Sequence, residues 1–233
     1  MNMKKLMCLL LALVLCLGTV GALADGEVTI SQVNFREIDD IWHTVYGFAK
    51  VENTGDEPIY LNNGMMQVFD AEGGEIVSEE YMNAYPLYLE PGKYAYVEME
   101  CELEEGMAAP ATAEMTVECE GDDYIKTVYL PVEVQLQLGV VEDWWESNWM
   151  TATVQNPTDA TLFDITLVMA LLDENDNILY MANAFLFDEI GVPAGGSIVL
   201  RNDISSSFMD YFAQKGIVPA KIDAIAYVEV YVE

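Results

Sequence analysis

Alternation of apolar and polar residues with a period of two recurs along this chain and restricts it to an all-β fold. The segment TVYGFAKVEN, residues 44–53, places Val45, Ala49 and Val51 on one face and Tyr46 and Phe48 on the other. The same alternation occurs in YAYVEMECEL, VEVQLQLG and IAYVEVYVE, and turn signals rich in Gly, Pro, Asn and Asp separate these runs. Many short strands with such punctuation predict antiparallel β-sandwiches.

One short helix interrupts this pattern. In SSSFMDYFAQKG, residues 205–216, the serines are suited to cap the start, and Gly216 is suited to end the helix. Phe208, Met209, Tyr211 and Phe212 would share one side.

An internal repeat divides the chain into two halves. GMMQVFDAEGGEIV, residues 64–77, matches LVMALLDENDNILY, residues 167–180, at an offset of 103. Beyond the turn the best match shifts to an offset of 102, which would align Pro91 with Pro193 and Val97 with Val199. We therefore expect two tandem immunoglobulin-like sandwich domains at residues 25–132 and 133–233, with the helix in the second. The segment GDDYIKTVYLPV has no counterpart after the second copy, so either that copy lacks its last strand or the segment belongs partly to the domain interface.

The first 24 residues have the pattern of a secretory signal peptide. Lys4 and Lys5 precede an apolar core, and Ala22-Leu23-Ala24 is a cleavage pattern with small residues at both ends. The core is shorter than the roughly 20 residues that a membrane-spanning helix needs. Leu15 before Cys16 disfavours lipoprotein processing, which needs a small residue there. We expect a protein of the extracellular space or the cell envelope, with no membrane span in the mature chain.

The strongly negative net charge disfavours nucleic acid and anionic lipid as binding partners. The chain has 40 Asp and Glu against 9 Lys and Arg, a formal net charge of −31. Such a surface repels nucleic acid and anionic lipid, which bind through Lys and Arg. The 52% hydrophobic content predicts a folded chain rather than a disordered acidic one.

The repeat resembles the FxLYD family of small extracellular bacterial domains. In the first copy the matching residues are Val51-Glu52-Asn53, Met66-Gln67-Val68-Phe69-Asp70, Gly73-Gly74 and Leu89-Glu90-Pro91-Gly92. In the second copy they are Val154-Gln155-Asn156, Met169-Ala170-Leu171-Leu172-Asp173, Asn175-Asp176-Asn177 and Val192-Pro193-Ala194-Gly195. Met replaces the motif Phe in both copies, and Phe69 and Leu172 replace the Tyr. The resemblance implies an immunoglobulin-like sandwich in a secreted or envelope-attached protein, and it carries over no catalytic residue.

Cys101 and Cys119 remain once the signal peptide is removed. Both lie on the apolar phase of alternating segments. They could form a disulfide across the core, which would stabilise the fold by about 3 kcal/mol. Alternatively, they are two buried thiols, and the sequence leaves both interpretations open. The outward glutamates beside each cysteine favour placing the two strands in opposite sheets, because like charges on adjacent strands repel.

The acid-rich turn DENDN, residues 173–177, has the alternating oxygen ligands of calcium loops. A helix-loop-helix calcium site needs Gly at the sixth position and an acid at the twelfth, where this chain has Ile178 and Ala184. The matching turn DAEGG of the first copy has Gly instead of acids and amides. Both turns suit the positive φ angles of a hairpin, so we predict a turn and no metal ligand.

The aromatic stretch EDWWESNW, residues 142–149, is the candidate interaction site. Trp144, Trp145 and Trp149 could stack on sugar rings or form a partner hot spot. Alternatively, Trp144 or Trp145 fills the sandwich core, as Trp42 would in the first copy, and this approximate counterpart favours the core interpretation.

Catalytic chemistry has little support in the sequence. His43 is the only histidine, and no nucleophile elbow, phosphate loop or dinucleotide fingerprint occurs. We expect no enzyme, no catalytic residue and no cofactor, but an interaction or scaffold module with a protein, cell-wall or glycan partner. The alternative is a carbohydrate-binding module using the Trp cluster, and a hydrolase with paired carboxylates is a third hypothesis.

Overall fold

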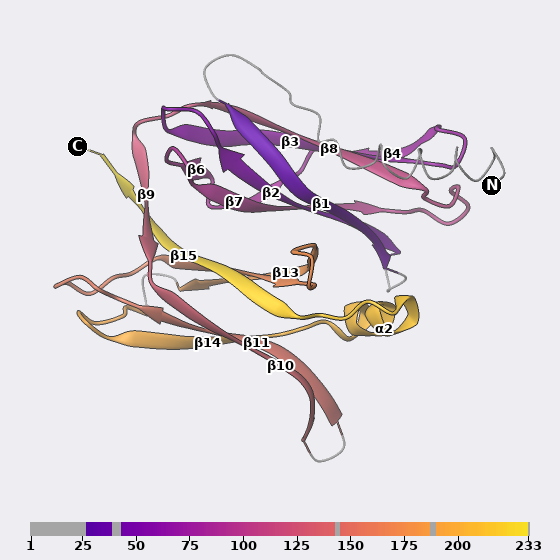
Figure 1. Ribbon diagram of the computed structural model, residues 1–233. Coiled ribbons are helices and arrows are strands. Elements are labelled where there is room, and N and C mark those ends of the chain that lie inside the picture. The colour runs from indigo at the N-terminus through magenta and orange to yellow at the C-terminus, as the bar shows by residue number, and fades with distance from the viewer. Residues whose placement is uncertain (1–26, 39–42, 143–144, 187–189, 233) are drawn as a thin grey trace, which may run out of the picture.

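The computed structural model describes residues 27–38, 43–142, 145–186 and 190–232. It consists of two antiparallel β-sandwiches in tandem, with one short helix in the second (Figure 1). The expected all-β fold of antiparallel β-sandwiches is confirmed.

The first sandwich has a four-stranded sheet facing a sheet built around β3. The four strands, in spatial order, are β1 (Val28–Ile38), β2 (Thr44–Asn53), β7 (Tyr94–Glu102) and β5 (Asn83–Tyr85). In the facing sheet β3 (Ile59–Phe69) pairs with β8 (Thr112–Gly121), β4 (Glu75–Glu79) and β6 (Tyr88–Leu89). The inward residues of both sheets form one buried core, which includes Val51, Val68, Val97 and Met115.

The second sandwich repeats this plan. One sheet has the order β10 (Val132–Glu142), β11 (Trp145–Gln155) and β14 (Ser197–Asp203). The other has the order β13 (Ile178–Leu186), β12 (Ile165–Leu172), β15 (Lys221–Tyr231) and β9 (Ile125–Leu130).

The predicted helix is present as α2 (Ser206–Lys215). It buries Phe208 and Phe212, and Gly216 ends it at a φ of 68°. The predicted serine cap was wrong, because Ser205 at the N-cap makes no side-chain capping bond.

Strand register corrects the alignment of the two halves. Ala49 pairs with Val97, and its counterpart Ala152 pairs with Leu200. Val97 therefore corresponds to Leu200, not to Val199, and the offset stays at 103. Loop hydrogen bonds agree, since Asn53 N donates to Lys93 O and Asn156 N donates to Gly196 O. The predicted shift to 102 relied on chance matches of residue type, Ile76 with Ile178, Pro91 with Pro193 and Val97 with Val199.

The segment after Cys119 is β9, and it belongs to the second sandwich by strand pairing. It leaves the end of β8, passes between the sandwiches and pairs antiparallel with β15 from Tyr231↔Ile125 to Ala226↔Leu130 (Figure 1). The sequence left two interpretations of this segment open: a strand that the second copy lacks, or a part of the interface between the domains. Its pairing with β15 supports the second interpretation. The predicted boundary between residues 132 and 133 falls after β9, although β9 completes a sheet of the second half.

The two sandwiches pack through aromatic side chains. Tyr46 and Phe48 point away from the first core and contact Phe208 of α2, with ring centroids 5.0 Å and 6.3 Å away. Tyr94 and Tyr96 donate hydrogen bonds of 2.7 Å and 2.6 Å to Asp223 Oδ2 on β15. Burial and these bonds raise the pKa of both phenols, so they remain protonated donors. The interface is therefore an extension of the second core.

Candidate binding site

The paired aspartates of the repeat close hairpin turns. Asp70 Oδ1 accepts bonds from the backbone N–H of Glu72 and Gly74, at 3.0 Å and 2.7 Å. Asp173 Oδ1 accepts from Asn175 and Asn177, at 2.8 Å and 2.9 Å. The prediction of a turn is confirmed by the positive φ angles of the equivalent residues Gly73 and Asp176 (82° and 67°). Across the described ranges, no group of three or more His, Cys, Asp or Glu side chains is arranged to hold a metal ion.

Cys101 and Cys119 lie in facing sheets, on β7 and β8, as predicted. Both are free thiols in this structure, so the disulfide interpretation has no bond to support it. Burial raises the pKa of Cys101 to about 11 and that of Cys119 above its usual value. Two thiols that resist ionisation are poor nucleophiles and pack as small apolar side chains.

The tryptophan cluster is described only at Trp149, because Trp144 and the side chain of Trp145 lie outside the described residues. Trp149 is 8% exposed. The guanidinium of Arg201 lies 3.9 Å from the centre of its ring. This ring is covered, so it offers no open face on which a sugar could stack.

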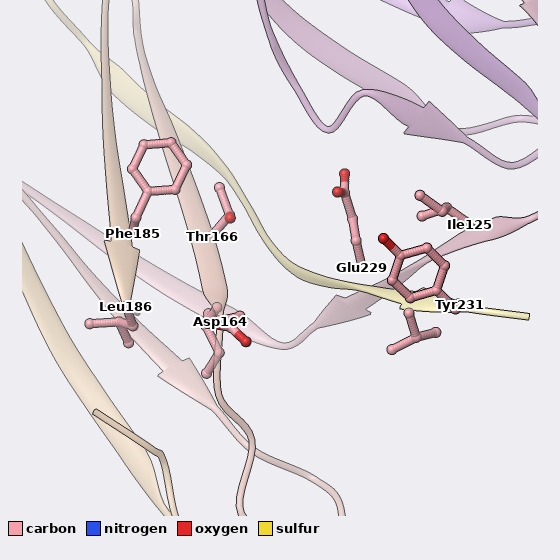
Figure 2. A pocket seen from close by; sticks show the side chains of 9 residues that line it. Ile125, Asp164, Thr166, Phe185, Leu186, Glu229 and Tyr231 are labelled. Atoms are coloured by element: carbon pink, nitrogen blue, oxygen red, sulfur yellow. The ribbon is translucent and has the colours of Figure 1, made fainter. Parts of the chain in front are cut away.

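A half-open cavity of about 370 Å³ lies where β12 begins and β13 and β15 end. Figure 2 shows Phe185 and Thr166 on one side of the opening and Glu229, Tyr231 and Ile125 on the other. Leu186 lies below Phe185, and Asp164 lies below Thr166. Asp164 has a φ of 54°, a left-handed conformation that Asp and Asn adopt more often than other non-glycine residues. Burial raises the pKa of Glu229 above its usual value.

Large apolar side chains are exposed around this cavity. Tyr231 is 84% exposed, Tyr124 73% and Val232 54%. The three are held together by the β9–β15 ladder, which continues through a 2.8 Å bond from Val232 N to Tyr124 O. With Phe185 and Val230, which are also exposed, these five residues form what we call the β9–β15 patch.

The patch and cavity combine apolar surface with two carboxylates, Asp164 and Glu229. This chemistry suits an apolar group that carries a positive charge or hydrogen-bond donors. Sequence reasoning missed the site because it treated IAYVEVYVE as an ordinary half-buried strand. The signal was present, since Val228, Val230 and Val232 alternate there with Tyr227, Glu229 and Tyr231, leaving apolar residues on both faces.

No family model and no curated protein matches this chain. Among solved structures, the chain is similar to the crystal structure of red sea bream transglutaminase, with 12% identity and a TM-score of 0.24. The alignment covers 91% of this chain and 31% of the transglutaminase chain. So distant a similarity carries no argument about activity.

Proposed function

We propose that this chain is a non-catalytic interaction module of the bacterial envelope or the extracellular space, and that it binds a protein partner through the β9–β15 patch. The observation that carries the proposal is the gathering of exposed apolar side chains around a cavity at one end of a sheet. Contiguous exposed apolar surface on a folded domain commonly marks a site of interaction.

The mechanism is that of a preformed docking surface. The patch is presented by paired strands, whose ladder holds the side chains in place before a partner arrives. Tyr231 and Tyr124 are amphipathic rings of the kind enriched at interface hot spots. Asp164 and Glu229 would supply orientation by accepting hydrogen bonds or pairing with a cation.

Glycan binding through the predicted tryptophan cluster is less favoured. Its described member Trp149 is buried beneath Arg201, whereas sugar-binding rings need an open face. The patch, by contrast, is open to solvent.

Site-specific photocrosslinking on intact cells tests the proposal. A photoreactive residue at position 231 should give a discrete protein adduct, and Phe185→Ser with Val230→Ser should abolish it. Val218, which is also exposed but lies outside the patch, provides the matched control position. Equal adducts from positions 231 and 218, or a glycan adduct at 231, would contradict a protein partner bound at the patch.

A further inference from the structure

Among the described residues, strand β8 of the first sandwich has a hydrogen-bonded neighbour on one side only. It pairs with β3 from Gly121↔Ile59 to Thr112↔Phe69. Within the described ranges no strand pairs with its other edge. An edge of this kind presents a row of free N–H and C=O groups that can accept another strand.

The second sandwich has a strand at the equivalent edge. Gly64 pairs with Val117, and its counterpart Leu167 pairs with Ala226, so β8 corresponds to β15. β15 pairs with β9 from Ala226 onward. The segment of β8 that corresponds to this part of β15 is residues 117–121. This edge of the fold therefore accepts an antiparallel strand in one copy, whereas in the other no strand of the described residues pairs with it.

The neighbouring strand packs in a similar way in the two sandwiches. β1 packs beside β8 while its own ladder runs to β2. In the second sandwich β10 packs beside β15 in the same way, and β9 nonetheless pairs with β15. The same arrangement in the first sandwich is thus compatible with an added strand.

The side chains of β8 indicate the chemistry of the missing strand. Glu114, Glu118 and Glu120 are exposed on its outward face. Among the described residues none of these three forms an ion pair. A second copy that paired through its own β8 would bring glutamates opposite glutamates, which is unfavourable. Met115 and Val117 face the core on the inward phase.

We infer that the outer edge of β8 binds an extended segment of a partner polypeptide by strand addition, and that this segment alternates Lys or Arg with apolar residues. Its backbone would continue the β3–β8 ladder, and its cations would lie beside Glu114, Glu118 and Glu120. This surface is separate from the β9–β15 patch, so either proposal can fail without the other.

A labelled ten-residue peptide of alternating valine and lysine is the probe, titrated against the full chain by fluorescence anisotropy. It should bind, and hydrogen exchange should slow at residues 117–121. The triple variant E114Q/E118Q/E120Q should bind about tenfold more weakly, which corresponds to three surface charge pairs of modest strength each.

Two controls separate strand addition from general charge attraction. The triple variant E72Q/E133Q/E174Q changes the net charge equally at exposed sites away from β8 and should alter affinity by less than about twofold. A peptide with proline at its two central valines should not bind, because it lacks the ladder donors. Equal weakening in both triple variants, binding of the proline peptide, or dimerisation through β8 would overturn the inference.

Discussion

The two sandwiches share a buried asparagine but differ at their surfaces. Asn53 and Asn156 are both fully buried at equivalent positions. Asn53 Nδ2 donates to the backbone oxygens of Glu57 and Leu89, and Asn156 Nδ2 donates to those of Ala160 and Val192. The outward sheet faces have diverged, because one is buried against the neighbouring sandwich and the other faces solvent.

Equivalent residues show this divergence directly. Tyr96 lies in the interface, whereas its counterpart Val199 is 62% exposed. The Asp223 carboxylate accepts hydrogen bonds from two tyrosine hydroxyls, whereas its counterpart Glu114 is exposed on β8. The repeat therefore preserves the groups that satisfy the buried backbone, while burial between the domains determines the remaining surface positions.

The largest expected effect tests the shared asparagines. Asn53→Ala and Asn156→Ala should each lower the free energy of unfolding by about 2–4 kcal/mol, because buried carbonyls lose their donor. Urea unfolding measures this loss. Asn175→Ala, in an exposed turn, is the control and should cost less than about 1 kcal/mol. A small loss at only one of the buried positions would break the equivalence of the two copies.

The interface hydrogen bonds come next. Tyr94→Phe and Tyr96→Phe should each cost about 1–3 kcal/mol, since each removes a donor from the partly buried Asp223 carboxylate. Tyr124→Phe, on an exposed ring, should be close to neutral. In a double-mutant cycle with Asp223→Asn, strictly additive effects would show that the tyrosines and Asp223 are not coupled.

The buried carboxyl group of Glu98 predicts a pH dependence of stability that its counterpart in the second sandwich does not give. Burial raises the pKa of Glu98 to about 7, with a further contribution from Glu100. Because the folded state holds this proton more tightly, stability should fall as pH rises from the ordinary carboxyl range through about 7. Glu98→Gln should remove this dependence and stabilise the protein by about 2 kcal/mol at pH 8.

The equivalent residue in the second sandwich, Arg201, provides the control. Arg201 is exposed and pairs with Asp203. Arg201→Gln should change stability by less than about 1 kcal/mol, with little pH dependence between pH 5 and 8. Parallel pH profiles for wild type and Glu98→Gln would contradict the burial of a carboxyl group at the interface.

The smallest expected effect concerns the two turn aspartates. Asp70→Ala and Asp173→Ala should each cost about 1 kcal/mol, because each removes a side-chain acceptor from two backbone N–H groups. Burial alone would raise the pKa of Asp173, but bonds from Asn177 and Asn175 lower it below its usual value. Its contribution should therefore be present at neutral pH and lost as pH falls below the ordinary range of aspartate. Calcium should leave the melting temperature of wild type unchanged, and a rise would contradict the assignment as a turn.

Much of the fold was predictable from local patterns. Alternation identified the strands, Gly216 marked the end of α2, and the aspartates identified the repeat and their own turns. These features depend on neighbours along the chain, which a single sequence displays.

Local patterns did not predict which strands pair with each other or which sheet faces are buried between the two sandwiches. IKTVYL reads as the second strand of a hairpin with β8, yet its pairing with β15 depends on a strand about a hundred residues later. Tyr94 and Tyr96 read as an outward face, and only the docking of the second sandwich buries them. The β9–β15 patch was missed for the same reason, because it exists only where the beginning of β9 meets the end of the distant strand β15.

Hydrogen–deuterium exchange of the unliganded chain tests the central claim, that the equivalent sheet edge is paired in the second sandwich and, among the residues the structure describes, unpaired in the first. In β15, the amides of Ala226 and Tyr227 should both be protected, because β12 lies on one side of these residues and β9 on the other. In β8, the alternate amides of residues 117–121 that point away from β3 should exchange on the order of a hundredfold faster. Equal protection of the two segments would contradict the claim.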